Sequence, residues 1–203
     1  MNTRERLLQI AYKHKLSHLG SCLTALPIIE EIYAIKRPGD IFVLSSGHAH
    51  LAHLVVMEKF DLVDAEQALE YGIHCDVLAG CDVSTGSLGL GITIAVGMAL
   101  ADRRKSVYCL ISDGEMAEGS VWEALNVVHK FNVENFKLYV NVNGYCAYDS
   151  TEPEYLRNRL IATKVPFEWR VTNSDLNNFS KGVLSHYKIM KTKEDYDTVL
   201  SLR

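Results

Sequence analysis

The chain has 203 residues, of which 48% are hydrophobic, and its formal net charge is −4. These values are ordinary for one globular domain with a buried core, so we expect a single domain over residues 1–203. The acidic balance, without basic runs interleaved with aromatic residues, argues against a nucleic-acid partner, and no apolar run is long enough to span a membrane.

The first half of the chain alternates helical and strand-like patterns. We expect helices over 3–16 and 24–36, a strand at 41–45, a helix near 48–60 and an irregular stretch across 71–87. The small residues of 92–101 are typical of a tightly packed helix.

Residues 107–145 predict a strand, a helix and a second strand. The apolar run 107–111 has the length and composition of a buried parallel strand. Apolar residues then recur at helical spacing between about 119 and 131, as Val121, Leu125 and Val128 show. A second strand-like run follows at 138–142. Asp113 and Asn143 therefore each lie at the carboxyl end of a predicted strand.

The remaining elements complete an α/β pattern. We expect a short helix near 153–162, a strand at 167–171, a helix near 174–186 and a final strand near 187–191. Strands and helices alternate without repeats or low-complexity linkers. This order predicts a doubly wound, mostly parallel α/β sheet with helices on both faces.

The residues around Asp113 are suited to a metal-bound diphosphate. Ligands of open α/β sheets bind at the carboxyl ends of strands, and Gly114 allows the backbone to approach a phosphate. The following helix start attracts a diphosphate, which a divalent cation would further neutralise. Asp113, Asn143 and a backbone carbonyl near Tyr145 offer the oxygen ligands that magnesium requires, and calcium or manganese could take its place. Singly, the Asp-Gly and Asn-Gly pairs indicate ordinary turns, and only their joint placement favours a site.

Four short motifs occur in a characteristic order along the chain. They are Ser17–Gly20, Val43–His48, Val83–Gly91, and the region that begins with Ser112-Asp113-Gly114 and closes with Asn141–Gly144. Together they resemble the cofactor-binding half of transketolases, with Ser112 in place of a glycine of that family. The resemblance implies the thiamine-diphosphate-binding fold and thiamine diphosphate with Mg²⁺ as cofactors.

The resemblance also implies roles for individual cofactor residues. His48 would contact the diphosphate, and Gly86 would accept a hydrogen bond from the aminopyrimidine ring. Leu88 would touch the cofactor rings, while Gly114 and Asn143 belong to the diphosphate and metal site.

Three further residues would serve the substrate and the partner. By resemblance, His18 approaches the sugar substrate, and His74 corresponds to a second substrate histidine. Glu118 matches the family residue that reaches across the subunit contact. Neither Glu115 nor Glu118 matches the glutamate that binds the aminopyrimidine, because that residue belongs to a pyrimidine-binding domain that this chain lacks.

The resemblance therefore implies a split enzyme. A separate subunit would carry the pyrimidine-binding domain, in an assembly of the α2β2 type. The reaction would transfer a two-carbon ketol unit from a ketose or ketose phosphate to an aldose. A half of a 1-deoxyxylulose-5-phosphate synthase or of a 2-oxo acid dehydrogenase E1 component stays open, as does a scaffold subunit without turnover.

The remaining histidines, His14, His50, His53, His129 and His186, indicate structural roles, and the cysteines indicate a reducing setting. His48, His50 and His53 cannot all share one helix face, because residues two apart diverge by roughly 200°, and this argues against a metal site there. The cysteines are odd in number and lack paired metal spacing: Cys22, Cys75, Cys81, Cys109 and Cys146. With a charged helix rather than a signal peptide at the N-terminus, they predict a cytoplasmic, reducing setting.

Overall fold

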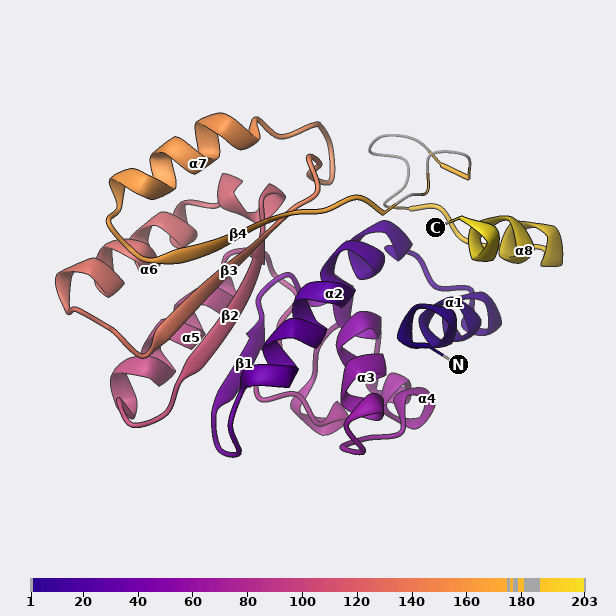
Figure 1. Cartoon of the computed structure of the whole chain (residues 1–203), viewed down its shortest axis with the longest axis horizontal. Helices are drawn as coiled ribbons and strands as arrows, with labels where there is room; N and C mark the ends of the chain where they lie inside the picture. Colours follow the sequence, from indigo (N-terminus) through magenta and orange to yellow (C-terminus); the bar gives the residue numbers. More distant parts are fainter. Residues whose placement is uncertain (1, 175, 177–178, 181–186, 203) are drawn as a thin grey trace.

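Four strands form one parallel sheet in the computed structural model of the chain, which describes residues 2–174, 176, 179–180 and 187–202 (Figure 1). The strands are β1 (Ile41–Leu44), β2 (Val107–Ser112), β3 (Phe136–Val142) and β4 (Phe167–Val171), and they are adjacent in this order. One row across the sheet runs through Val43, Cys109, Leu138 and Phe167. All carboxyl ends therefore lie at the same edge of the sheet.

Helices cover both faces of this sheet (Figure 1). Helices α5 (Leu90–Ala101), α6 (Gly119–Lys130) and α7 (Pro153–Ala162) lie on one face, and α1 (Thr3–His14), α2 (Leu19–Ile35) and α3 (His50–Lys59) lie on the other. Alternate strand residues enter two cores, because successive side chains of a strand point to opposite faces. Val43 and Cys109 pack with α5 and α6, whereas Phe42 and Leu110 pack with α2 and α3. The expected parallel α/β fold with helices on both faces is confirmed.

The predicted elements agree with the structure over most of the chain. The helix predicted for 24–36 begins earlier, at Leu19, and the helix predicted near 48–60 is divided into η1 (Gly47–Ala49) and α3. The stretch before α5 is irregular, as expected, and its short elements are α4 (Ala65–Ala68), η2 (Leu69–Tyr71) and η3 (Val77–Ala79). Between β2 and α6 the chain forms one 3-10 turn, η4 (Gly114–Ala117).

The C-terminal predictions are partly wrong. Residues 187–191 form no strand, and the described sheet ends with β4. The chain instead forms α8 (Lys193–Ser201), which begins with a capping box in which the Thr192 hydroxyl accepts the backbone N–H of Asp195 at 3.1 Å. Helix α8 packs beside α1 (Figure 1). The helix predicted at 174–186 lies largely outside the described residues.

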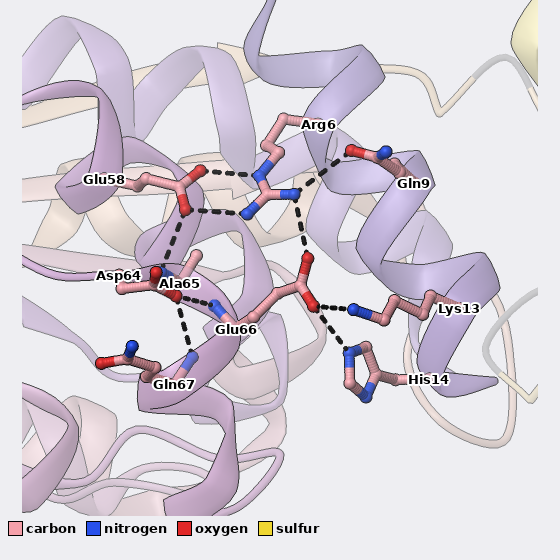
Figure 2. Close-up of polar contacts among 9 residues, drawn as sticks. All are labelled: Arg6, Gln9, Lys13, His14, Glu58, Asp64, Ala65, Glu66 and Gln67. Atoms are coloured by element: carbon pink, nitrogen blue, oxygen red, sulfur yellow. Dashed lines mark hydrogen bonds and ion pairs between the residues drawn. The ribbon is translucent and has the colours of Figure 1, made fainter.

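A network of charged side chains joins α1 to α3 and α4 (Figure 2). The Arg6 guanidinium donates two hydrogen bonds to Glu58, at 2.8 and 3.0 Å, and one to Glu66 at 3.0 Å. Lys13 also forms an ion pair with Glu66. Within the described ranges, none of the helices is both long and apolar enough to cross a membrane.

Candidate functional site

The ends of β2 and β3 bring Asp113 and Asn143 together. Asp113 directly follows β2, and its side chain is buried. The backbone N–H groups of Asn143 and Gly144 donate to its carboxylate at 3.3 and 2.9 Å, and the Thr151 hydroxyl donates at 2.5 Å. Burial raises the pKa of Asp113, and the hydrogen bonds from Thr151 and Gly144 oppose that rise. The loop after β3 is therefore folded around this carboxylate.

Asn143 and Tyr145 each carry an oxygen atom in the loop that surrounds Asp113. The side-chain oxygen of Asn143 accepts the N–H of Tyr145 at 3.0 Å, and the Tyr145 carbonyl oxygen lies 2.9 Å from where a Cβ on Gly114 would be. Oδ2 of Asp113 accepts the two shorter hydrogen bonds, whereas Oδ1 accepts the longer one from Asn143. Each carboxylate oxygen offers two lone pairs, so Oδ1 keeps capacity for a cation. This donor set fits a hard divalent cation that prefers oxygen ligands.

Gly114 is held tightly by the same loop. An added Cβ would lie 2.9 Å from both the Tyr145 carbonyl oxygen and the Cys146 Cα. From the sequence, the expected reason for a glycine at this position was the close approach of a phosphate. The structure adds a second reason, because the backbone of 145–146 occupies the space that a side chain would need.

A small pocket adjoins these residues at the carboxyl edge of the sheet. Its lining is mostly hydroxyl, amide and small side chains, and consists of Ser21, Ser46, His48, Ala49, Leu88, Ser112, Gly114, Asn141, Asn143, Tyr145 and Cys146. The structure thus brings His48, Leu88, Gly114, Asn143 and Tyr145, all predicted from the sequence, to one pocket. Open α/β sheets bind their ligands at this edge.

His18 and His48 lie beside each other. Their ring centroids are 5.3 Å apart, and both line a second small pocket. His18 precedes α2 with φ of 62°, in the left-handed region, and its Nδ1 lies 2.7 Å from the Ser17 hydroxyl. Non-glycine residues adopt this backbone conformation rarely, and such strain gathers at functional sites.

His74, Gly86 and Glu118 lie farther along the same region. His74 and Gly86 line a third pocket, which shares Ile73 with the pocket of His18. A Cβ on Gly86 would lie 3.3 Å from the His74 ring. Glu118 is exposed at the start of α6, next to Gly89.

Sequence reasoning missed the structural position of Glu115. This residue is fully buried, and one of its carboxylate oxygens accepts the Ser45 hydroxyl at 2.5 Å and the Gly89 N–H at 2.6 Å. Its own N–H donates to the Ser112 hydroxyl at 3.1 Å. Burial raises the pKa of Glu115 to about 7. Glu115 therefore joins the ends of β1 and β2 to the glycine-rich loop, a link that no local sequence signal predicts.

Comparison with known proteins identifies the family. Residues 1–151 match the family model described as 1-deoxy-D-xylulose-5-phosphate synthase. A protein from Phocaeicola vulgatus, named as one of the subunits of apulose-4-phosphate transketolase, is 30% identical over 196 residues, a match that covers 83% of this chain and 68% of that protein. The chain belongs to the transketolase family. The expected resemblance is confirmed, and the chain corresponds to the N-terminal domain of the family.

Single-chain transketolases match over a smaller share of their own length. Human transketolase is 38% identical over 149 residues, which is 62% of this chain but 24% of that protein. A transketolase structure from Pichia stipitis aligns with a TM-score of 0.69 and 21% identity, over 84% of this chain and 35% of that chain. The structure from Leishmania mexicana gives 0.64 and 22%, over 79% and 30%. At these identities the structures support the transketolase fold alone.

Proposed function

We propose that this chain is the diphosphate- and metal-binding half of a split, transketolase-like enzyme that uses thiamine diphosphate. One observation carries the proposal. Asp113 and Asn143, separated by a helix and a strand in the sequence, meet at the carboxyl edge of the sheet, next to the pocket that contains His48 and Leu88. The membership of the transketolase family supports the choice of cofactor.

In this proposal, the metal is held by oxygen atoms of the chain. Asp113 supplies the carboxylate, Asn143 the amide oxygen and Tyr145 the backbone carbonyl. The cation is Mg²⁺, with Ca²⁺ or Mn²⁺ as substitutes of the same oxygen preference. Thr151 and Gly144 keep the Asp113 carboxylate in place through hydrogen bonds.

Other residues would bind the cofactor and the sugar. His48, Gly86, Leu88 and Gly114 surround the cofactor, which supplies carbanion stabilisation when it is bound. His18 would hydrogen-bond the sugar beside His48, because their rings are adjacent. His74 would act on the substrate from the side of Gly86. An imidazole suits these tasks because it can donate, accept and exchange a proton near neutral pH.

A second subunit completes the proposed enzyme. The match covers 24% of human transketolase, whereas the relative of which it covers 68% is named as one subunit of its enzyme. The partner would carry the pyrimidine-binding domain, in an α2β2 assembly, and the exposed Glu118 would contact it. The five free cysteines favour a reducing, cytoplasmic setting for this assembly.

The test is ketol transfer by the chain alone and with its partner. The chain is purified by itself and together with the product of a neighbouring reading frame, and transfer from a ketose phosphate to an aldose is measured. We expect activity only in the presence of both polypeptides, Mg²⁺ and thiamine diphosphate. Full activity of the isolated chain would contradict the split-enzyme proposal.

Matched histidine variants test the cofactor pocket. His48→Ala should weaken the retention of thiamine diphosphate without abolishing it, because other residues also surround the cofactor. His129→Ala is the control. His129 lies in the last turn of α6, far from Asp113, and lines a groove at the opposite end of the strands. Equal retention of thiamine diphosphate by both variants would show that His48 does not bind the cofactor.

A second candidate function is a half of a 1-deoxyxylulose-5-phosphate synthase, which the name of the matching family model favours. The same purified assembly separates the two candidates. A transketolase would transfer a ketol unit from a ketose to an aldose, whereas a synthase of this type would form 1-deoxyxylulose 5-phosphate. A scaffold subunit would assemble identically with and without the cofactor and would catalyse neither reaction.

A further inference from the structure

Two histidines and two cysteines meet in the core beside α3, outside the candidate site around Asp113. His50 and His53 lie one turn apart on α3, and Cys75 and Cys81 flank the 3-10 turn η3. All four side chains are buried, and the most exposed, Cys81, is 6% accessible. Residues three apart share a helix face, so this pair meets the cysteines although the string of three histidines with His48 cannot. The absence of paired metal spacing among the cysteines gave no sign of this arrangement.

The ligand atoms of His50, Cys75 and Cys81 are close enough to share one metal ion, and His53 Nδ1 lies within 4.0 Å of both sulfur atoms. The Cys81 Sγ lies 3.5 Å from His50 Nε2 and 3.5 Å from His53 Nδ1, and the Cys75 Sγ lies 4.0 Å from His53 Nδ1. The ligand atoms of His50, Cys75 and Cys81 all lie within 4.8 Å of one another. In a tetrahedral zinc site, with Zn–N near 2.0 Å and Zn–S near 2.3 Å, a nitrogen and a sulfur ligand are about 3.5 Å apart.

The charge balance of the proposed ligands suits a divalent cation. A buried thiolate is unfavourable unless a positive charge lies next to it. Two thiolates and two neutral imidazoles around Zn²⁺ give a net charge of zero, which suits a site that is closed to water.

A neighbouring hydroxyl orients the His53 ring, whereas Nδ1 of His50 is buried without a hydrogen-bond partner among the described residues. The Tyr33 hydroxyl lies 2.6 Å from His53 Nε2, which leaves Nδ1 of that ring directed at the cysteines. The only hydrogen bond of the His50 ring in the described part of the chain is with the Cys81 thiol. Metal-bound histidines usually have such a partner on their second nitrogen, as His53 does.

We propose that His50, His53, Cys75 and Cys81 bind one structural Zn²⁺. Four protein ligands close the coordination sphere, which is typical of structural rather than catalytic zinc. Binding would release the two thiol protons to solvent. The ion would link α3 to the irregular segment that precedes α5. Because the Thr85 N–H donates to the Cys75 carbonyl at 3.0 Å, this attachment would also position the neighbouring Gly86.

Elemental analysis of the purified full-length chain tests the proposal. The chain is expressed in zinc-supplemented medium, purified with reductant and dialysed, and zinc is measured by mass spectrometry. We expect about one zinc per chain. Cys75→Ala and Cys81→Ala should reduce this to below about a tenth, because a structural site needs all four ligands. Cys109→Ala is the matched control, since this buried cysteine lies in the other core. Asp113→Asn should also retain the zinc.

Cobalt substitution keeps the test decisive if a cysteine variant does not fold. The wild-type chain, stripped of metal and supplied with Co²⁺, should show the visible absorption bands of tetrahedral thiolate–imidazole coordination. Absence of both zinc and these bands in folded wild-type protein would overturn the proposal. A Cys75–Cys81 disulfide in protein that still binds no zinc after reduction would also overturn it. Equal loss of zinc in Cys109→Ala and Cys81→Ala would do the same.

Discussion

The Asp113 carboxylate organises the loop after β3 through hydrogen bonds from Asn143, Gly144 and Thr151. This part of the site was predictable at the level of single residues. Strand ends of a parallel sheet share one edge, so Asp113 and Asn143 were expected to meet. The hydrogen bonds of Glu115 and the cluster around Cys81 were not predictable, because they join segments whose approach depends on the complete fold.

Gly114→Ala should disturb the site by crowding the loop around Tyr145. The new Cβ would lie 2.9 Å from a backbone oxygen and a backbone Cα, and neither can move without the loop. We expect a loss of about 1–3 kcal/mol in the free energy of unfolding, as for other overpacked positions. Denaturant titration of the purified chain measures it.

Gly97→Ala is the matched control for this prediction. Gly97 lies within α5, and nothing lies within 4 Å of an added Cβ. Alanine in a helix is favoured over glycine by roughly 0.5–1 kcal/mol, so this variant should be as stable as the wild type or more stable. An equal loss of stability in both variants would contradict the close contact at Gly114.

The helices and strands that were predicted correctly are those with a clear local pattern of apolar and polar residues. The strand at 167–171 and the helix at 153–162 agree with β4 and α7. The start of α2 was missed because the side chain of its N-cap residue, His18, makes no capping hydrogen bond to the helix backbone. The strand expected near 187–191 was wrong, and the capping box at Thr192 was the signal for a helix instead.

The charged contacts of α1 predict an acid-sensitive attachment. Hydrogen bonds from Lys13 are the largest cause that lowers the pKa of Glu66 to about 2, and Arg6 lowers that of Glu58. A carboxyl group whose pKa is lower in the folded chain than in the unfolded chain stabilises the fold at pH values above 4.5, its ordinary pKa. This stabilisation is lost as the pH falls from 4.5 towards about 2.

Arg6→Met should therefore lower the melting temperature at pH 7, and its difference from the wild type should shrink as the pH falls from about 4.5 towards 2. The expected loss in the free energy of unfolding at pH 7 is only about 1 kcal/mol, because these side chains are partly exposed to water. Thermal unfolding across this pH range measures it.

Arg104→Met is the control for the charge itself. Arg104 pairs with Asp102, two residues away, and its side chain is 90% exposed. That substitution should leave the melting temperature unchanged. A pH-independent effect of Arg6→Met, or an equal effect of Arg104→Met, would show that the network around Glu66 does not fasten α1.

The molecule as a whole would form one side of a shared site in the proposed split enzyme. The three pockets that contain His18, His48 and His74 adjoin one another through the shared lining residues His48 and Ile73. The sequence predicted the fold class and the family, since four motifs occur in a fixed order. It did not predict the sugar, because the proposed partner would complete the pocket that selects it.

The decisive measurement for the proposed metal-bound diphosphate is the affinity of the assembled two-subunit complex for thiamine diphosphate in the presence of Mg²⁺. Calorimetry compares the wild type with Asp113→Asn, which removes the charge at almost constant volume, and with Asp102→Asn, an acidic position outside the site. We expect Asp113→Asn to weaken binding by at least about 10-fold, since even changes around a metal ligand have effects of this size, while Asp102→Asn binds normally. Unchanged affinity of the folded Asp113→Asn complex would contradict the metal-bound diphosphate on which the proposed function rests.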